Sequence, residues 1–156
     1  MTRRNPSRLD RPTGALLRVL SALVAARFVH LTAHWRARGV TSFGDHKMFE
    51  TLYKDIDDQI DRLAERIVTL GGVENLQHAY LLQSALDQVK DTGTFWPTSP
   101  PDGTSLAARS LLLELALLDA INDARRDPTT PGVDNLLQGF YDAHEAVIYH
   151  LRQRIS

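Results

Sequence analysis

Residues 34–72 read HWRARGVTSFGDHKMFETLYKDIDDQIDRLAERIVTLGG, and they contain one long amphipathic pattern. Between residues 43 and 70, apolar side chains recur at spacings of three and four: Phe49, Leu52, Tyr53, Ile56, Ile60, Leu63, Ile67 and Leu70. This period predicts a helix and does not fit a strand. The pair Gly71-Gly72 ends the pattern, as expected where a left-handed residue follows a helix.

The polar face of this predicted helix carries a histidine and three carboxylates. His46, Glu50, Asp61 and Glu65 fall within about 100° on a helical wheel, beside the apolar stripe. His46 and Asp61 are nevertheless separated by about 22 Å along the helix axis. Metal ligands of these types lie about 2 to 2.5 Å from the ion, so no single ion reaches both within one chain.

A second copy of the chain removes this difficulty. If two such helices cross antiparallel near Lys54 and Asp55, the histidine and Glu50 of one chain stand opposite Asp61 and Glu65 of the other. Because a two-fold interface is isologous, the same operation makes two such sites. The wheel permits this arrangement.

Several fixed spacings in this region resemble a known family. They are His34-Trp35, Gly39, Phe43, His46 with an acid four residues later, D-x-x-A-E-R at 61–66 and Leu70-Gly71-Gly72. The chain resembles the Dps family, the DNA-binding proteins from starved cells, also called mini-ferritins. A weaker match, N-L-L-x-x-x-x-x-A-H-E followed by H-L-R, lies between Asn135 and Arg152. The sequence departs from the family at Glu50, where Asp is usual, and at Tyr149, where Trp is frequent.

The resemblance implies a fold and a function. The fold is an all-α, ferritin-like four-helix bundle with a short extra helix between the second and third long helices. The function is iron storage in a hollow dodecamer that oxidises Fe(II), preferably with hydrogen peroxide, and protects DNA from oxidative damage. By position, the resemblance assigns the ligands His34, His46 and Glu50 to one subunit, and Asp61 and Glu65 to its two-fold mate. Such carboxylate-rich sites favour iron over metals that prefer soft ligands, and an acid such as Asp58 or a backbone carbonyl would orient a histidine.

Composition sets wider bounds. The 156 residues suit one domain, which we place at residues 13–156 after a polar tail at 1–12. The chain has no cysteine, a formal net charge of −1 and a pI of about 6.6, so thiolate chemistry and polycation behaviour are excluded. The apolar stretch 15–29 is interrupted by Arg18 and Arg27 and lacks a cleavage site. We therefore expect no transmembrane helix, no signal peptide and a cytoplasmic location.

The tail contains four arginines: Arg3, Arg4, Arg8 and Arg11. One interpretation is a solvated terminus without a partner. The other is a basic arm that contacts DNA phosphates with steep salt dependence, strengthened by many copies on one particle. A DNA-binding protein of this kind would be associated with the nucleoid. Asp10 and the slightly acidic chain count against DNA binding, and both interpretations stay open.

The other predicted helices span residues 13–38, 75–89, 105–126 and 130 onward, with Thr130 as N-cap and Pro131 as first helical residue. The loop 91–103 is expected to be held by Phe95 and Trp96. We expect Phe28 in the core, and Trp35 as a core or interface aromatic, or as an oxidisable ring. His30 is interpreted as structural. The residues expected at the surface are His144, His150 and Arg154.

Asp119, Asp123 and Asp127 follow one another at four-residue spacing. Two interpretations fit: a charged outer face, or an acidic iron-entry pore that focuses the electric field. No Glu in the chain is followed by His three residues later, so the Glu-x-x-His motifs of an intrasubunit di-iron site are missing. The alternative function is a DNA-compacting or scaffold oligomer of helical subunits whose metal site has decayed.

Overall fold

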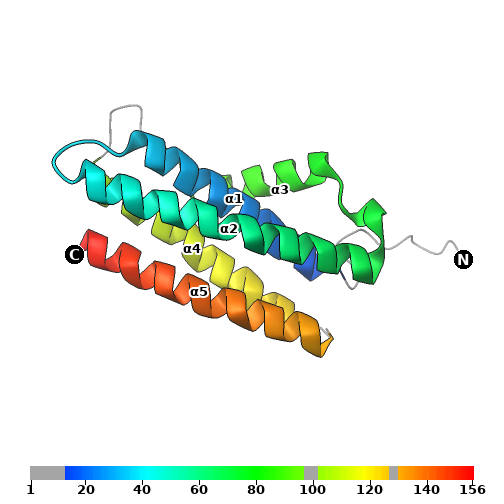
Figure 1. The fold of residues 1–156 in the computed structure, drawn as a ribbon. Helices are drawn as coiled ribbons and strands as arrows, with labels where there is room; N and C mark the ends of the chain where they lie inside the picture. Colours follow the sequence, from blue (N-terminus) through cyan, green and yellow to red (C-terminus); the bar gives the residue numbers. More distant parts are fainter. Residues whose placement is uncertain (1–12, 97–101, 127–129) are drawn as a thin grey trace, which may run out of the picture.

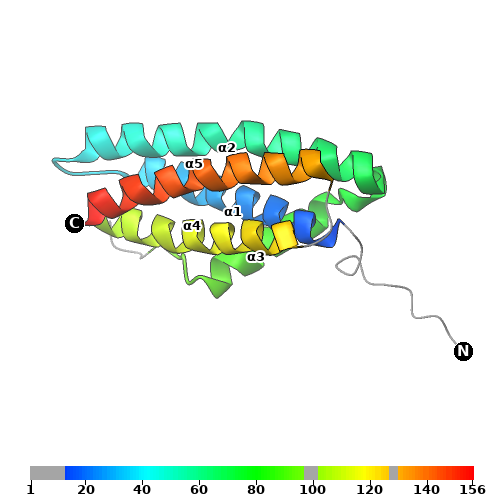
Figure 2. The same cartoon turned by 90° about the horizontal axis from the view of Figure 1, so that it is seen from below.

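The computed structural model describes residues 13–96, 102–126 and 130–156. These residues form helices throughout, with no strand among them: α1 (Gly14–Arg36), α2 (Ser42–Gly71), a 3-10 turn (Val73–Asn75), α3 (His78–Asp91), α4 (Gly103–Arg126) and α5 (Pro131–Ile155). The four long helices lie side by side as a bundle, and the short α3 packs outside it against α1 (Figures 1 and 2). The predicted all-α, four-helix fold with one extra short helix is confirmed.

The order of the helices gives the bundle two antiparallel hairpins. α1 pairs with α2, and α4 pairs with α5, while α2 and α4 run in the same direction (Figure 1). The connection between α2 and α4, which includes α3, therefore brings the chain back along the length of the bundle. This topology leaves one side of α2 uncovered by any other long helix.

α1 contributes more buried apolar residues to the core than any other described helix. Its buried residues point in every direction around the axis, because α2, α3 and α4 all pack against it. Its length and a mean hydropathy of 1.6 over 18 residues would suit a membrane span, but 72% of that window is buried inside the bundle. The bundle core thus accounts for the apolar character of α1.

The helix limits agree with the sequence to within three residues, although α1 ends at Arg36 and not at 38, and α3 ends at Asp91 and not at 89. α5 begins as predicted, with the Thr130 side chain accepting from the backbone N–H of Val133. The third helix begins at His78 and not at residue 75, because residues 73–75 form the 3-10 turn. α4 begins at Gly103, two residues early, where the Asp102 carboxylate accepts from the N–H of Ser105 and caps the first turn.

Predictions about three single side chains need correction. Phe28, expected in the core, is 59% exposed, and Leu70, the last residue of the predicted apolar stripe, is 45% exposed. Arg154, expected at the surface, donates to the buried Asp45 and to the Thr104 and Thr41 hydroxyls, so it joins the end of α5 to the starts of α2 and α4. Burial raises the pKa of Asp45, but the hydrogen bonds from Arg154 and Thr41 outweigh it and leave that pKa below its ordinary value.

The loop before α4 is held by one of its two predicted anchors. The indole N–H of Trp96 donates to Thr32 Oγ1 on α1 at 2.8 Å, which fixes the loop to the bundle. Phe95 is 53% exposed and lines an apolar groove between α1 and α3.

Candidate metal centre

Two of the predicted ligands meet where α1 ends and α2 begins. The ring centroids of His34 and His46 lie 3.6 Å apart, and the rings are tilted by 31°. The turn that brings them together contains Gly39 at a φ of +88°, a conformation that other L-residues rarely adopt. Two histidines separated by 12 residues in the sequence therefore become neighbours through one tight turn.

Backbone hydrogen bonds fix which ring nitrogens are available. His34 Nδ1 lies 2.9 Å from the carbonyl oxygen of His46, and His46 Nδ1 lies 3.0 Å from the carbonyl oxygen of His34. Because a carbonyl oxygen only accepts, both Nδ1 atoms carry the proton and donate. In the neutral form, each Nε2 then has a free lone pair, the form in which histidine binds a metal.

Glu50 lies one turn after His46 on α2. Its carboxylate is bound by Lys47 at 3.0 Å and by Lys54 at 2.5 Å. The hydrogen bond from Lys54, and then that from Lys47, hold the pKa of Glu50 at about 2. The carboxylate is thus ionised near neutral pH, as a metal ligand must be, but two ammonium groups occupy it in the single chain.

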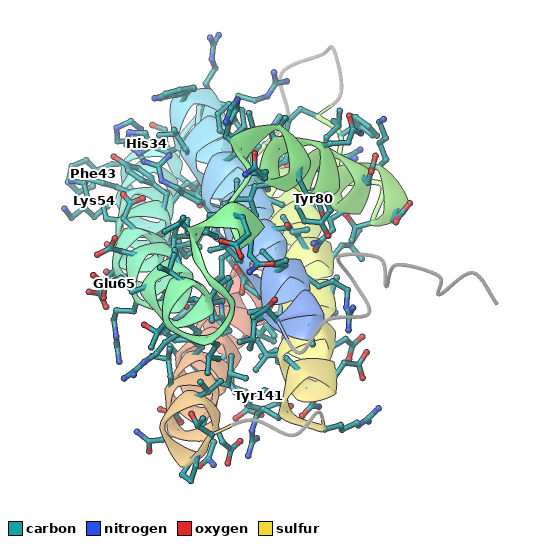
Figure 3. The ribbon with its side chains drawn as sticks, turned by 90° about the vertical axis from the view of Figure 1, so that its right-hand side faces the viewer. His34, Phe43, Lys54, Glu65, Tyr80 and Tyr141 are labelled. Carbon is teal, nitrogen blue, oxygen red and sulfur yellow. The ribbon has the colours of Figure 1, made fainter. Side chains whose placement is uncertain are left out.

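Asp61 and Glu65 are exposed on the second half of α2. Figure 3 shows Phe43, Lys54 and Glu65 in succession along one edge of the molecule, with His34 at its upper end. We call His34, His46 and Glu50 the histidine half, and Asp61 and Glu65 the acidic half. Over the described residues, no three histidine or acidic side chains of one chain come together in a group suited to a metal. One chain presents two separated halves.

Aromatic side chains border the histidine half. The Tyr53 ring meets the His34 ring edge to face, with centroids 5.5 Å apart. Trp35, next to His34, is 62% exposed, which fits an interface aromatic or an oxidisable ring and excludes a core role within one chain.

The bundle core contains a polar network that the sequence did not reveal. Glu114 on α4 lies 2.6 Å from His30 Nε2 on α1 and 2.6 Å from His144 Nδ1 on α5, and His144 Nε2 lies 2.9 Å from the amide oxygen of Gln59 on α2. All four side chains are buried. The prediction that His144 lies at the surface was therefore wrong, while His30 is structural as interpreted.

The charge state of this network follows from its partners. Burial raises the pKa of Glu114, but hydrogen bonds from His144 and His30 outweigh it and bring that pKa to about 2. An ionised carboxylate only accepts, so both imidazoles donate to it. His144 Nε2 faces the Gln59 amide, so both nitrogens of this buried ring have a polar partner in the core.

The remaining candidates contribute less. Asp119 and Asp123 are exposed on α4, and Asp123 pairs with Arg126 at 3.0 Å. Asp127 and the tail arginines Arg3, Arg4, Arg8 and Arg11 lie outside the described residues. The iron-entry pore and the DNA-binding arm stay predictions.

Comparison with known proteins points to one family. The profile of the Ferritin-like domain family matches residues 13–156. DNA protection during starvation proteins of Brevibacillus brevis and Helicobacter pylori are each 44% identical to this chain, over 39 and 50 residues. These matches cover 25% and 32% of this chain and only 26% and 34% of those proteins.

The fold is shared over a much longer range. The crystal structure of the Dps protein from Vibrio cholerae O1, described as a member of a broad superfamily of ferritin-like diiron-carboxylate proteins, superposes with a TM-score of 0.77. The alignment covers 96% of this chain and 91% of that one, at 22% sequence identity. At this identity, the likeness establishes the fold alone.

Proposed function

Because the chain belongs to the Dps family of the ferritin-like superfamily, we propose that it binds Fe(II) and oxidises it at a site shared by two subunits. The histidine half of one chain and the acidic half of its two-fold mate together form the site. Iron is the substrate and, as a ferric mineral, the stored product. The family membership supports iron binding, and the residues below support the place of the reaction.

The observation that carries this proposal is the reciprocal hydrogen bonding of His34 and His46. Each ring is fixed through Nδ1 by the other's backbone carbonyl, so both Nε2 lone pairs are preserved for a cation. A pair that only packed together would not need both rings held in the same tautomer. The sequence left open whether Asp58 or a backbone carbonyl would orient a histidine. In this chain the backbone carbonyls orient both rings, and the Asp58 carboxylate accepts from Arg62 instead.

The ligand types suit iron chemistry. Two imidazoles and up to three carboxylates form a mixed nitrogen and oxygen set, which suits iron and contains no thiolate. Hydrogen peroxide accepts two electrons, one from each of two Fe(II), and yields two Fe(III) and two hydroxide ions. The carboxylates would stabilise the ferric product, which carries more positive charge than the substrate.

The acidic half cannot serve a site within its own chain. Asp61 lies about 22 Å along the helix from His46, so the nearest carboxylates of that kind must come from another copy. An antiparallel two-fold pair of α2 helices supplies them, and supplies them twice. The wider dodecamer, hydrogen peroxide as oxidant, DNA protection and the cytoplasmic location form part of the same proposal and rest on the family resemblance.

The experiment is an anaerobic Fe(II) titration followed by a pulse of hydrogen peroxide, with ferric absorbance as the readout. We expect saturable binding and rapid oxidation in the wild type, and loss of both in Asp61→Ala/Glu65→Ala. The matched control is Asp142→Ala/Glu145→Ala, which removes two exposed carboxylates from α5 and should behave as the wild type. Equal, slow oxidation in all three proteins would favour the alternative, a scaffold oligomer whose metal site has decayed.

A further inference from the structure

One antiparallel register of the exposed α2 stripe brings the two halves of the shared site together. If His46 stands opposite the partner's Glu65, and Glu50 opposite the partner's Asp61, every other position on the stripe has a defined counterpart. The two helices then cross between residues 55 and 56. This register rests on the proposed function, but its other contacts can be tested without iron.

The same register places opposite charges together at the crossing. Lys54 stands opposite the partner's Asp57, and two-fold symmetry repeats the pair. Each residue is within two positions of the crossing, about 2 Å along the axis, so the pair stays opposed at any crossing angle. In the single chain the side chains of Lys54 and Asp57 are 57% and 52% exposed, and both are accessible to a partner.

We propose that Lys54 changes partners when two chains associate. In the single chain, its ammonium group lies 2.5 Å from Glu50 Oε1. In the two-fold pair, it binds the partner's Asp57 and leaves Glu50 free to bind iron. Association then supplies the acidic half of the site and also removes a cation from the histidine half.

Asp57 retains capacity for this second partner. Its carboxylate accepts from Arg27 on α1, and Oδ2 is 3.3 Å from the Arg27 terminal nitrogen. A carboxylate offers about four lone-pair sites, and half of this side chain faces solvent. The partner's lysine therefore joins Arg27 and does not have to displace it.

An apolar contact at each end supports the same register. Phe43 is 85% exposed at the start of α2 and lies on the ligand stripe. It is at the height of the partner's Val68, a half-buried apolar residue on the same stripe. By contrast, Lys47 is at the height of the partner's Ala64 and has no charged counterpart there. Lys47 is therefore the natural control for Lys54, since both bind Glu50 in the single chain.

The test exchanges the two charges between chains. Lys54→Glu and Asp57→Lys each place like charges opposite one another twice, so each variant alone should raise the dissociation constant of the two-fold pair about tenfold or more. An equimolar mixture should restore association, because each new charge then meets its opposite. Lys47→Met, which removes the other ammonium group from Glu50 without adding a charge, is the control for Lys54→Met and should associate as the wild type. Sedimentation equilibrium measures association, and circular dichroism verifies that every variant is folded.

The outcomes separate this register from the proposed function. If both single variants associate as the wild type, or if the mixture stays dissociated, Lys54 does not move from Glu50 to the partner's Asp57. If a charge-reversed chain fails to fold, Lys54→Met and Asp57→Asn take its place, because they only remove a charge. Each should raise the dissociation constant of the two-fold pair by a smaller factor. Anaerobic Fe(II) titration of the same samples is the second measurement. A mixture that associates but binds no iron would contradict the proposed function while preserving the register.

Discussion

The rings of His34 and His46 lie with their centroids 3.6 Å apart, and each donates its Nδ1 proton to the backbone carbonyl of the other. His34 lies in the last turn of α1 and His46 in the second turn of α2, so the pair depends on the turn between the helices. That turn requires Gly39 at φ +88°. The conformation of a single glycine thus helps to determine whether the two candidate ligands come together.

Replacing Gly39 should disturb both stability and the histidine pair. Gly39→Ala meets no side chain within 4 Å, but it forces a non-glycine residue into the left-handed region, at a cost of about 1 to 2 kcal/mol. We expect that loss in chemical denaturation, together with weaker Fe(II) binding. The matched control is Gly44→Ala in α2, which is also free of neighbours and should stabilise the helix by about 0.5 to 1 kcal/mol. Equal effects at the two positions would contradict the role of the turn.

The buried Glu114 should be essential for stability. Glu114→Gln keeps the size of the side chain but removes the ionised carboxylate that accepts from His30 and His144. Removing one member of a buried charged network costs about 3 to 5 kcal/mol, and we expect a loss of that size in the free energy of unfolding. Glu145→Gln, one residue after His144 and exposed, is the control and should stay within about 0.5 kcal/mol of the wild type. A similarly small change in Glu114→Gln would show that the network contributes little.

The same carboxyl predicts how stability depends on pH. The pKa of Glu114 falls from an ordinary 4.5 to about 2 in the fold. A carboxyl with a depressed folded pKa stabilises the fold at pH values above its unfolded pKa, and that contribution is lost as the pH falls through the folded pKa. We therefore expect the free energy of unfolding to decrease between about pH 4.5 and pH 2, measured at one fixed protein concentration. Glu114→Gln should show a shallower decrease, whereas equal slopes would argue against Glu114 as the source.

The N-terminal arginines predict a DNA-binding result that does not depend on iron. Deleting residues 1–11 should abolish retardation of duplex DNA in a gel, because the remaining chain is slightly acidic overall. Increasing salt should weaken retardation by the full-length protein steeply. Retardation at low salt that is unchanged by the deletion would contradict the arm, and the solvated-terminus interpretation would then hold.

The sequence predicted the fold well because helical period is a local signal. The three- and four-residue spacing placed the ends of α2 within one residue, and Thr130-Pro131 placed the start of α5. The start of α4 at Gly103 also has a local signal, because the Asp102 carboxylate accepts from the N–H of Ser105 three residues later. The candidate metal ligands were predicted from their spacing together with the family resemblance. Neither predicted that the His34 and His46 rings contact each other or that their Nδ1 atoms donate to backbone carbonyls.

Pairings across the bundle could not be predicted in this way. The burial of His144 was readable, since it lies four residues after Phe140 and four before Ile148 on the apolar stripe of α5. Its partners were not, because Glu114 and Gln59 are 30 and 85 residues away. The ion pair of Arg154 could not be predicted for the same reason, since Asp45 is 109 residues distant. Phe28 was assigned to the core by period, although it faces an open groove between α1 and α3.

If two chains share each iron site, mixing two complementary variants tests this sharing most directly. One variant carries His46→Ala/Glu50→Ala and keeps the acidic half, and the other carries Asp61→Ala/Glu65→Ala and keeps the histidine half. Each alone should show no saturable Fe(II) binding in an anaerobic titration. When the two variants are refolded together in equal amounts, half of the randomly formed pairs are mixed. Each mixed pair has one complete site out of two, so about one quarter of the wild-type sites should be restored. No recovery in the mixture, or full binding by either variant alone, would contradict a site shared between subunits.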